Sequence, residues 1–177
     1  GKSALENNTT AADNIGIGGN ALFTNTTGAS NVAVGTSSMY YNTTASSNTA
    51  VGHAALNANT TGADNTAIGA NALDANTTGA NNVAMGRDAL AANTTAVSNV
   101  AVGHDAMATN TTGAYNVAMG DIALRDNLDT NYNVAIGHNT LTVATAADNT
   151  AMGVSALDHN STGANNVAIG RNAGNAI

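Results

Sequence analysis

The sequence contains no Cys, no Pro and no Trp, and only 8% of its residues are charged and 3% aromatic. Without Cys, neither disulfide bonds nor cysteine-ligated metal sites can form. The hydrophobic fraction of 43% is inflated by Ala, so a thick core of bulky side chains is excluded. Stability must therefore come from close backbone packing and regular hydrogen bonding.

Charge and hydropathy exclude two classes of partner. The net charge is −7 and the four basic residues are scattered along the chain, whereas nucleic-acid binding requires clustered Lys and Arg. No apolar run approaches the roughly 20 residues that membrane insertion requires. Disordered chains usually carry high charge and much Pro, whereas this chain has Val, Ile, Leu or Met at fixed intervals. We therefore expect a folded chain.

The sequence repeats with a period of 17 residues, apart from one unit of 16. Ten units cover residues 1–169, and a partial unit covers 170–177. The period is defined by the Gly that opens each unit: Gly1, Gly18, Gly35, Gly52, Gly69, Gly86, Gly103, Gly120, Gly137, Gly153 and Gly170.

Within the unit, the fifth position is always Leu or Met, and the last is always Ile, Val or Met. Two places before the last comes Val, Ile or Thr, with Ala between them in all but the first unit. The fourteenth position is Asn throughout: Asn14, Asn31, Asn48, Asn65, Asn82, Asn99, Asn116, Asn133, Asn149 and Asn166.

This pattern predicts an all-β fold. Apolar residues two apart indicate a strand with one inward face, and 17 residues leave no room for two helices. We predict one domain over 1–177, a parallel β-solenoid (β-roll) of ten coils, each with two short strands and two bends. At about 4.8 Å per coil, the rod would be roughly 48 Å long. Equal residues then stack, and the Asn column becomes an amide ladder.

If the Val and Met of each Val-Ala-Met phrase face inward, the Ala between them faces outward. Exposed apolar stripes usually mark interfaces, so we predict an inter-chain seam. The alternative is a flattened coil with Ala inside, which leaves a monomeric rod. The seam would consist of Ala33, Ala50, Ala67, Ala84, Ala101, Ala118, Ala135, Ala151 and Ala168.

Asn-x-Thr/Ser sequons recur along the chain as candidate glycosylation sites. The same residues are typical turn formers, and this interpretation is favoured because sugars about 4.8 Å apart would crowd one another. The candidate acceptors are Asn25, Asn42, Asn59, Asn76, Asn93, Asn110 and Asn160.

Five aromatic residues fall at matching positions of neighbouring units. They would form short exposed ladders that could contact a partner, a cell-surface glycan or protein. Simple stacking, at about 0.2–1 kcal/mol per pair, is the favoured alternative. The five are Phe23, Tyr40, Tyr41, Tyr115 and Tyr132.

No enzymatic constellation is visible. His53, His104 and His138 share the second position of the unit but not in neighbouring units, whereas a metal site needs clustered ligands. No Ser, His and Asp trio has meaningful spacing. We expect no catalytic residue, no metal and no cofactor.

The phrase N-x-V-A-[IVM]-G, as in Asn82–Gly86 and Asn133–Gly137, resembles the head repeats of trimeric autotransporter adhesins. The longer unit, with Ala55-Leu56 at mid-unit and N-T-T-G at Asn59–Gly62, looks like repeats of phage tail fibres and related bacterial tail-fibre-domain proteins. The resemblance implies a left-handed β-roll assembled as a homotrimer. The adhesin repeat is usually shorter than this one, and no anchor, coiled-coil stalk or chaperone module is visible here.

The resemblance and the repeats together predict a non-enzymatic extracellular fibre segment, a shaft or head for surface attachment on a cell or virion. Neither end of the repeat is capped, so copies could instead join head to tail as a self-polymerising filament. A second alternative is an ice- or glycan-binding solenoid. Ice-binding faces need two outward Thr columns two residues apart, whereas adjacent Thr residues alternate in direction.

Overall fold

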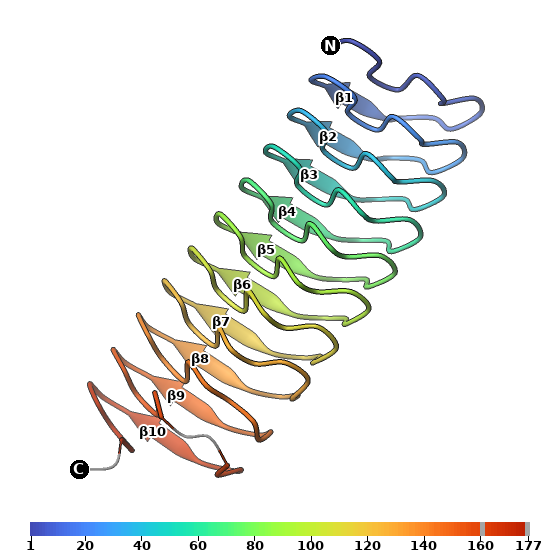
Figure 1. Ribbon diagram of the computed structural model, residues 1–177. Coiled ribbons are helices and arrows are strands. Elements are labelled where there is room, and N and C mark those ends of the chain that lie inside the picture. Colours follow the sequence, from blue (N-terminus) through green and yellow to red (C-terminus); the bar gives the residue numbers. More distant parts are fainter. Residues whose placement is uncertain (160–161, 176–177) are drawn as a thin grey trace.

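The computed structural model describes residues 1–159 and 162–175 and shows a rod of stacked coils (Figure 1). Each coil contributes one strand of three residues. The strands are β1 (Ile15–Ile17), β2 (Val32–Val34), β3 (Thr49–Val51), β4 (Thr66–Ile68), β5 (Val83–Met85), β6 (Val100–Val102), β7 (Val117–Met119), β8 (Val134–Ile136), β9 (Thr150–Met152) and β10 (Val167–Ile169).

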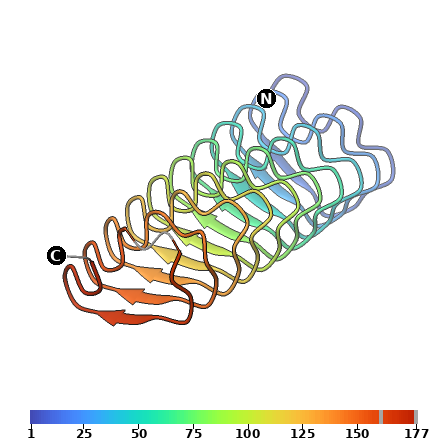
Figure 2. The same ribbon diagram turned by 60° about the horizontal axis from the view of Figure 1, so that its bottom comes forward.

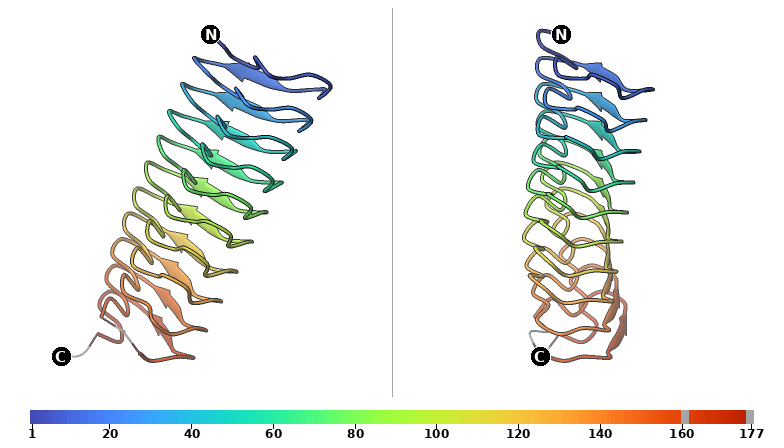
Figure 3. Two further views of the ribbon diagram at one scale, coloured as in Figure 1. Left: turned by 45° about the vertical axis from the view of Figure 1, so that its right-hand side comes forward. Right: turned by 90° about the vertical axis from the view of Figure 1, so that its right-hand side faces the viewer.

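The strands form one parallel sheet in the order of the chain, from β1 to β10. Its register joins equivalent residues of neighbouring coils, so that Val83 lies beside Val100 and Ala84 beside Ala101. The sheet occupies one side of the rod, and irregular arcs form the other (Figures 2 and 3). The expected all-β parallel solenoid is thereby confirmed. No helix in the described part of the chain has the length and apolar character of a membrane span.

The second strand expected in each coil is absent from the described residues. Left-handed backbone takes its place, as at Ala54 (φ 52°) and Leu56 (φ 53°), and such residues cannot continue a strand. The arc still bonds to its neighbours, because the Leu56 amide donates to the carbonyl of Ala72 in the next coil at 2.9 Å. The prediction of a second strand failed because the periodicity of the sequence does not show which residues adopt a left-handed backbone conformation.

A column of Leu and Met from the arc fills the interior. In Ala55-Leu56, two consecutive side chains are both fully buried, whereas in a regular strand they would point to opposite faces. The positive φ of Leu56 turns its side chain inward beside that of Ala55. The fully buried members of the column are Leu22, Met39, Leu56, Leu73, Leu90, Met107, Leu124 and Leu141.

The predicted strand orientation is wrong. The Ala at the centre of each strand faces the core, and the residues on either side of it face outward. The interior admits only a small group there: a Cβ placed on Gly16 would lie 3.0 Å from Leu5 Cγ. The inward Ala side chains are Ala33, Ala50, Ala67, Ala84, Ala101, Ala118, Ala135 and Ala151, all fully buried, and Ala168.

The Asn at the fourteenth position of each unit forms a ladder along the rod. The Oδ1 of Asn48 accepts from the backbone N–H of Asn65 in the next coil at 2.9 Å. The Nδ2 of Asn65 donates in turn to the carbonyl of Gly79 at 2.9 Å. Each rung thus joins a side chain to the backbone of the next coil. No buried side-chain N or O atom in the described residues lacks a partner.

Candidate interaction surface

The outer face of the sheet carries two parallel columns of side chains, which we call the apolar strip. It contains the first and third residues of every strand, and three of these are Thr while none is charged. The columns are Ile15, Val32, Thr49, Thr66, Val83, Val100, Val117, Val134, Thr150 and Val167, and Ile17, Val34, Val51, Ile68, Met85, Val102, Met119, Ile136, Met152 and Ile169.

The strip is accessible to solvent along its length. Met85 is 40% exposed, Met119 43% and Met152 42%, and most of the others are half-buried. Ten strands about 4.8 Å apart and columns about 6.7 Å apart give an area of roughly 300 Å². Single exposed apolar residues are ordinary, whereas a continuous apolar patch of a few hundred Å² is often functional.

Two further columns flank the strip. The acidic border precedes each strand by two positions, holds three carboxylates and no basic residue, and consists of Asp13, Ser30, Ser47, Asp64, Asn81, Ser98, Tyr115, Tyr132, Asp148 and Asn165. The basic border is the residue after the Gly that opens each unit and consists of Lys2, Gly19, Thr36, His53, Ala70, Arg87, His104, Asp121, His138, Val154 and Arg171.

The candidate glycosylation acceptors form a second amide ladder inside the rod. The Nδ2 of Asn76, the atom that a sugar would modify, donates to Oδ1 of Asn59 at 2.9 Å and to the carbonyl of Gly79 at 3.0 Å. Modification would break both bonds, so these residues are not acceptors in the folded rod. The buried members are Asn25, Asn42, Asn59, Asn76, Asn93 and Asn110, whereas Asn160 lies outside the described residues.

The five aromatic residues form two stacks. Phe23 and Tyr40 are 5.1 Å apart between centroids, and Tyr41 meets Tyr40 edge-on at 4.6 Å. Tyr115 and Tyr132 are parallel within 7° at 5.3 Å. Each stacked ring covers one face of its neighbour, which removes part of the surface that a sugar would use.

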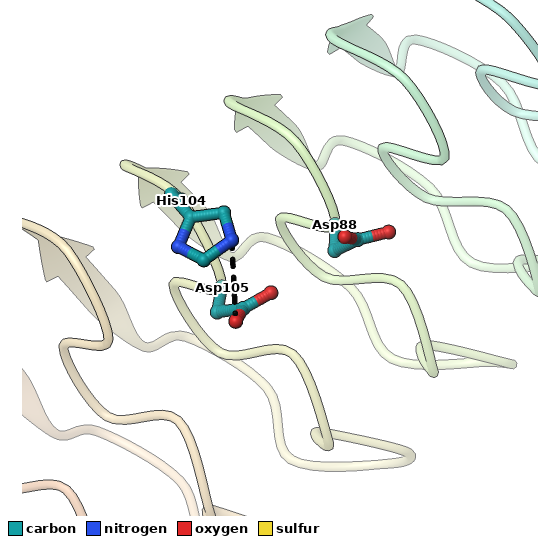
Figure 4. A group of neighbouring side chains, drawn as sticks. All are labelled: Asp88, His104 and Asp105. Carbon is teal, nitrogen blue, oxygen red and sulfur yellow. Dashed lines mark ion pairs between the residues drawn. The ribbon is translucent and has the colours of Figure 1, made fainter.

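Asp88, His104 and Asp105 place possible metal-ligating atoms within 4.8 Å of one another (Figure 4). Sequence reasoning missed this group, although Asp88 and Asp105 share the third position of neighbouring units. The guanidinium of Arg87 bonds to the Asp88 carboxylate at 2.7 Å and contacts the His104 ring. The positively charged side chain of Arg87 therefore already contacts two of the three residues that could bind a metal ion.

A chain of side-chain contacts continues along the basic border. Asp121 lies between two histidines, 2.9 Å from Nδ1 of His104 and 3.4 Å from Nε2 of His138. The sequence pattern showed that the histidines do not occupy neighbouring coils, but not that a carboxylate between them joins the two.

The described residues enclose no pocket. No family model, no curated protein and no solved structure matches the chain. The apolar strip and its borders are therefore the strongest functional feature of the molecule.

Proposed function

We propose that the chain is a rigid, non-enzymatic segment of an extracellular fibre, a shaft or head of the tail-fibre or trimeric-adhesin type. The observation that supports this proposal most strongly is the apolar strip. An uncharged face along a rod favours burial against an equally long and uncharged surface, and a second copy of the same chain offers one.

Rigidity follows from the way the coils are joined. Both Asn ladders, the parallel sheet and the arc hydrogen bonds all run along the rod axis. Bending the rod would lengthen many of these bonds at once. A stiff rod of this kind suits a spacer that holds an attachment surface away from a cell or virion.

The proposed assembly is a homotrimer of left-handed rolls, with the apolar strips turned toward a common axis. The seam is thus formed by the outward columns of the strands and not by the Ala column. Support comes from the repeat resemblance and from the charge distribution, because the charged residues lie on the borders and in the arcs and none lies on the strip.

Light scattering on the purified chain tests this proposal. We expect a mass of three times the 17.3 kDa of the monomer. Val100→Glu, at the centre of the strip, should reduce the mass toward that of the monomer while circular dichroism stays unchanged. Thr61→Glu, exposed on the arc, is the matched control and should leave the oligomer intact.

The outcome also separates the alternatives. If the wild-type chain is monomeric, the proposed homotrimer is wrong, and the apolar strip no longer supports a fibre of this type. Long filaments in electron microscopy would favour the self-polymerising alternative instead. Ice binding has weaker support, because only three of the strip's residues are Thr, and thermal hysteresis measurements would test it.

A further inference from the structure

We infer that Asp88, His104 and Asp105 form a binding site for one divalent transition-metal ion such as Zn²⁺, and that the guanidinium of Arg87 is the cation that the metal displaces. The inference goes beyond the proposed fibre function and holds for a single copy of the chain. The expectation that the chain binds no metal rested on the spacing of the histidines, whereas two of these three ligands are carboxylates.

The three side chains come from neighbouring coils and meet at the surface of the rod (Figure 4). His104 and Asp105 belong to one coil, and Asp88 occupies in the preceding coil the position that Asp105 has in its own. Two ligands bound to Zn²⁺ at about 2.1 Å lie roughly 3.4 Å apart at tetrahedral angles. Nε2 of His104 and Oδ2 of Asp105 are already 3.4 Å apart. Because the three possible ligand atoms lie within 4.8 Å of one another, small side-chain rotations complete the site.

The pairing of Asp88 with Asp105 is itself unusual in this sequence. They are the only two acidic residues at the same position of neighbouring units, although the chain has few charged residues to place. Like charges directly opposite each other on neighbouring strands are destabilising, and the same repulsion acts between stacked coils about 4.8 Å apart. A divalent cation between the two carboxylates would remove it.

The hydrogen bonds of His104 leave a lone pair available to a metal. Arginine donates hydrogen bonds and cannot accept them, so Nε2 of His104, which contacts the Arg87 guanidinium, is the ring nitrogen without a proton. Nδ1 then carries the proton and donates to Oδ1 of Asp121 at 2.9 Å. Metal-binding histidines usually donate their other N–H to a carboxylate in this way. Asp121 is therefore a positioning residue for His104.

The two carboxylates are also held for binding. Oδ1 of Asp88 accepts from Nδ2 of Asn71 at 3.0 Å, which fixes the carboxylate from the side away from Arg87. The Asp105 carboxylate accepts no hydrogen bond in the described part of the chain and keeps its acceptor capacity for a metal. The backbone amide of Asp105 donates to the carbonyl of Arg87 at 3.1 Å. The ligands thus stand on coils that are hydrogen-bonded to each other.

The Arg87 guanidinium marks the place of the cation. It donates to Oδ2 of Asp88 at 2.7 Å and contacts Nε2 of His104, so two of the three ligands already face a positive group. One guanidinium cannot neutralise both Asp88 and Asp105, whereas a divalent ion does. The Arg87 side chain is 62% exposed, and an exposed ion pair of this kind contributes little to stability. A metal ion can therefore displace it into solvent.

The donor set selects the class of metal. One imidazole nitrogen and two carboxylate oxygens suit Zn²⁺ and similar first-row ions. Mg²⁺ and Ca²⁺ take oxygen ligands, so the nitrogen of His104 discriminates against them. Three protein ligands leave the fourth tetrahedral position to water, which the partial exposure of His104 and Asp105 allows.

Isothermal titration calorimetry with ZnCl₂ on the metal-free chain, prepared without a histidine tag, tests the site. We expect one Zn²⁺ per chain. His104→Ala should abolish binding, and Arg87→Gln should bind several-fold more tightly because the competing guanidinium is gone. His53→Ala is the matched control: His53 has the same position of the unit but is followed by Ala54 in place of Asp, and its loss should leave the affinity unchanged.

Nuclear magnetic resonance of the imidazole nitrogens gives a second measurement, since the chain has only four histidines. Zn²⁺ should shift the Nε2 signal of His104 and leave that of His53 in place. Asp121→Asn should weaken binding by about 10–100-fold and alter the Nδ1–H signal of His104, while circular dichroism stays unchanged. A change in the tautomer of His104 separates this positioning role from a general loss of stability.

The outcomes decide the inference independently of the fibre proposal. A wild-type chain that does not bind one Zn²⁺, or a His104→Ala variant that still binds it, would overturn the site. Equal binding of Mg²⁺ would also overturn it, because the carboxylates would then attract any divalent ion. Unchanged affinity in Arg87→Gln would show that the guanidinium does not occupy the site. None of these results bears on the homotrimer, which light scattering tests separately.

Discussion

The side-chain amide of Asn76 donates a hydrogen bond to Oδ1 of Asn59 in the preceding coil at 2.9 Å. It also donates to the Gly79 carbonyl at 3.0 Å, and its own Oδ1 accepts from Asn93 at 2.7 Å. The side chain is fully buried. One amide thus joins three consecutive coils in a fully buried site.

Replacing Asn76 with Ala should lower the free energy of unfolding by about 2–4 kcal/mol, because it removes the side-chain donor to the buried Oδ1 of Asn59 and leaves Nδ2 of Asn93 with only its 3.3 Å bond to the Ala96 carbonyl. Urea denaturation followed by circular dichroism measures the loss. Thr78→Ala, at an exposed position two residues away, should change the free energy by less than about 0.5 kcal/mol. Equal losses in both variants would contradict the interior ladder.

A second prediction concerns Ile122, which has a φ of 52°. A β-branched residue in the left-handed region is strained, and Asn occupies the same position of the unit at Asn20 and Asn71. Ile122→Asn should therefore raise the free energy of unfolding by about 1 kcal/mol. Asn20→Ile, the reverse change, should lower it.

Thermal unfolding measures both variants. A lower melting temperature for Ile122→Asn would show that its apolar contacts outweigh the backbone strain, contrary to this prediction.

The 17-residue period was sufficient to predict a parallel solenoid, because equal residues in ten units indicate equal environments. It was not sufficient to orient the strand. Val83 and Met85 are the larger apolar residues, and burial by hydrophobicity alone places them inside. Their exposure follows from the narrow interior, where Leu90 already fills the space opposite the sheet.

The burial of the Asn residues in the N-T-T-G phrases could not be predicted from the sequence either. Asn76 lies in the phrase N-T-T-G, which is typical of a surface turn. Polar residues are usually exposed, and only the ladder geometry shows that this amide satisfies its own hydrogen bonds. The one available signal was the recurrence of Asn at the same position in the first eight units.

Asp74 provides a pH-dependent prediction. Burial raises the pKa of its carboxyl above the ordinary value of 3.8, while His53 lowers it and Asp88 raises it further. Because the folded pKa is raised, the carboxyl's contribution to stability is fully present below pH 3.8 and is lost as the pH rises through the folded pKa. Asp74→Asn should therefore raise the melting temperature at pH 7 and have little effect near pH 3.

Thermal unfolding of wild type and variant at both pH values measures this difference. A gain of equal size at pH 3 and pH 7 would mean that the amide acts through packing or hydrogen bonding, and that ionisation of Asp74 is not the cause.

The last prediction tests the orientation of the strands. Ala84 is fully buried, and an added Cβ at the equivalent Gly16 already lies 3.0 Å from Leu5 Cγ. Ala84→Val adds two methyl groups where the coil has no space for them. We expect it to lower the free energy of unfolding by about 1–3 kcal/mol.

The matched control is Thr66→Val on the adjacent strand. Thr66 lies in the outward column, where most other coils already carry Val, so Val fits there without displacing the core. Urea denaturation should show little change for Thr66→Val and a clear loss for Ala84→Val. If Ala84→Val is tolerated as well as Thr66→Val, the Ala column does not face the core, and an inter-chain seam along Ala would have to be reconsidered.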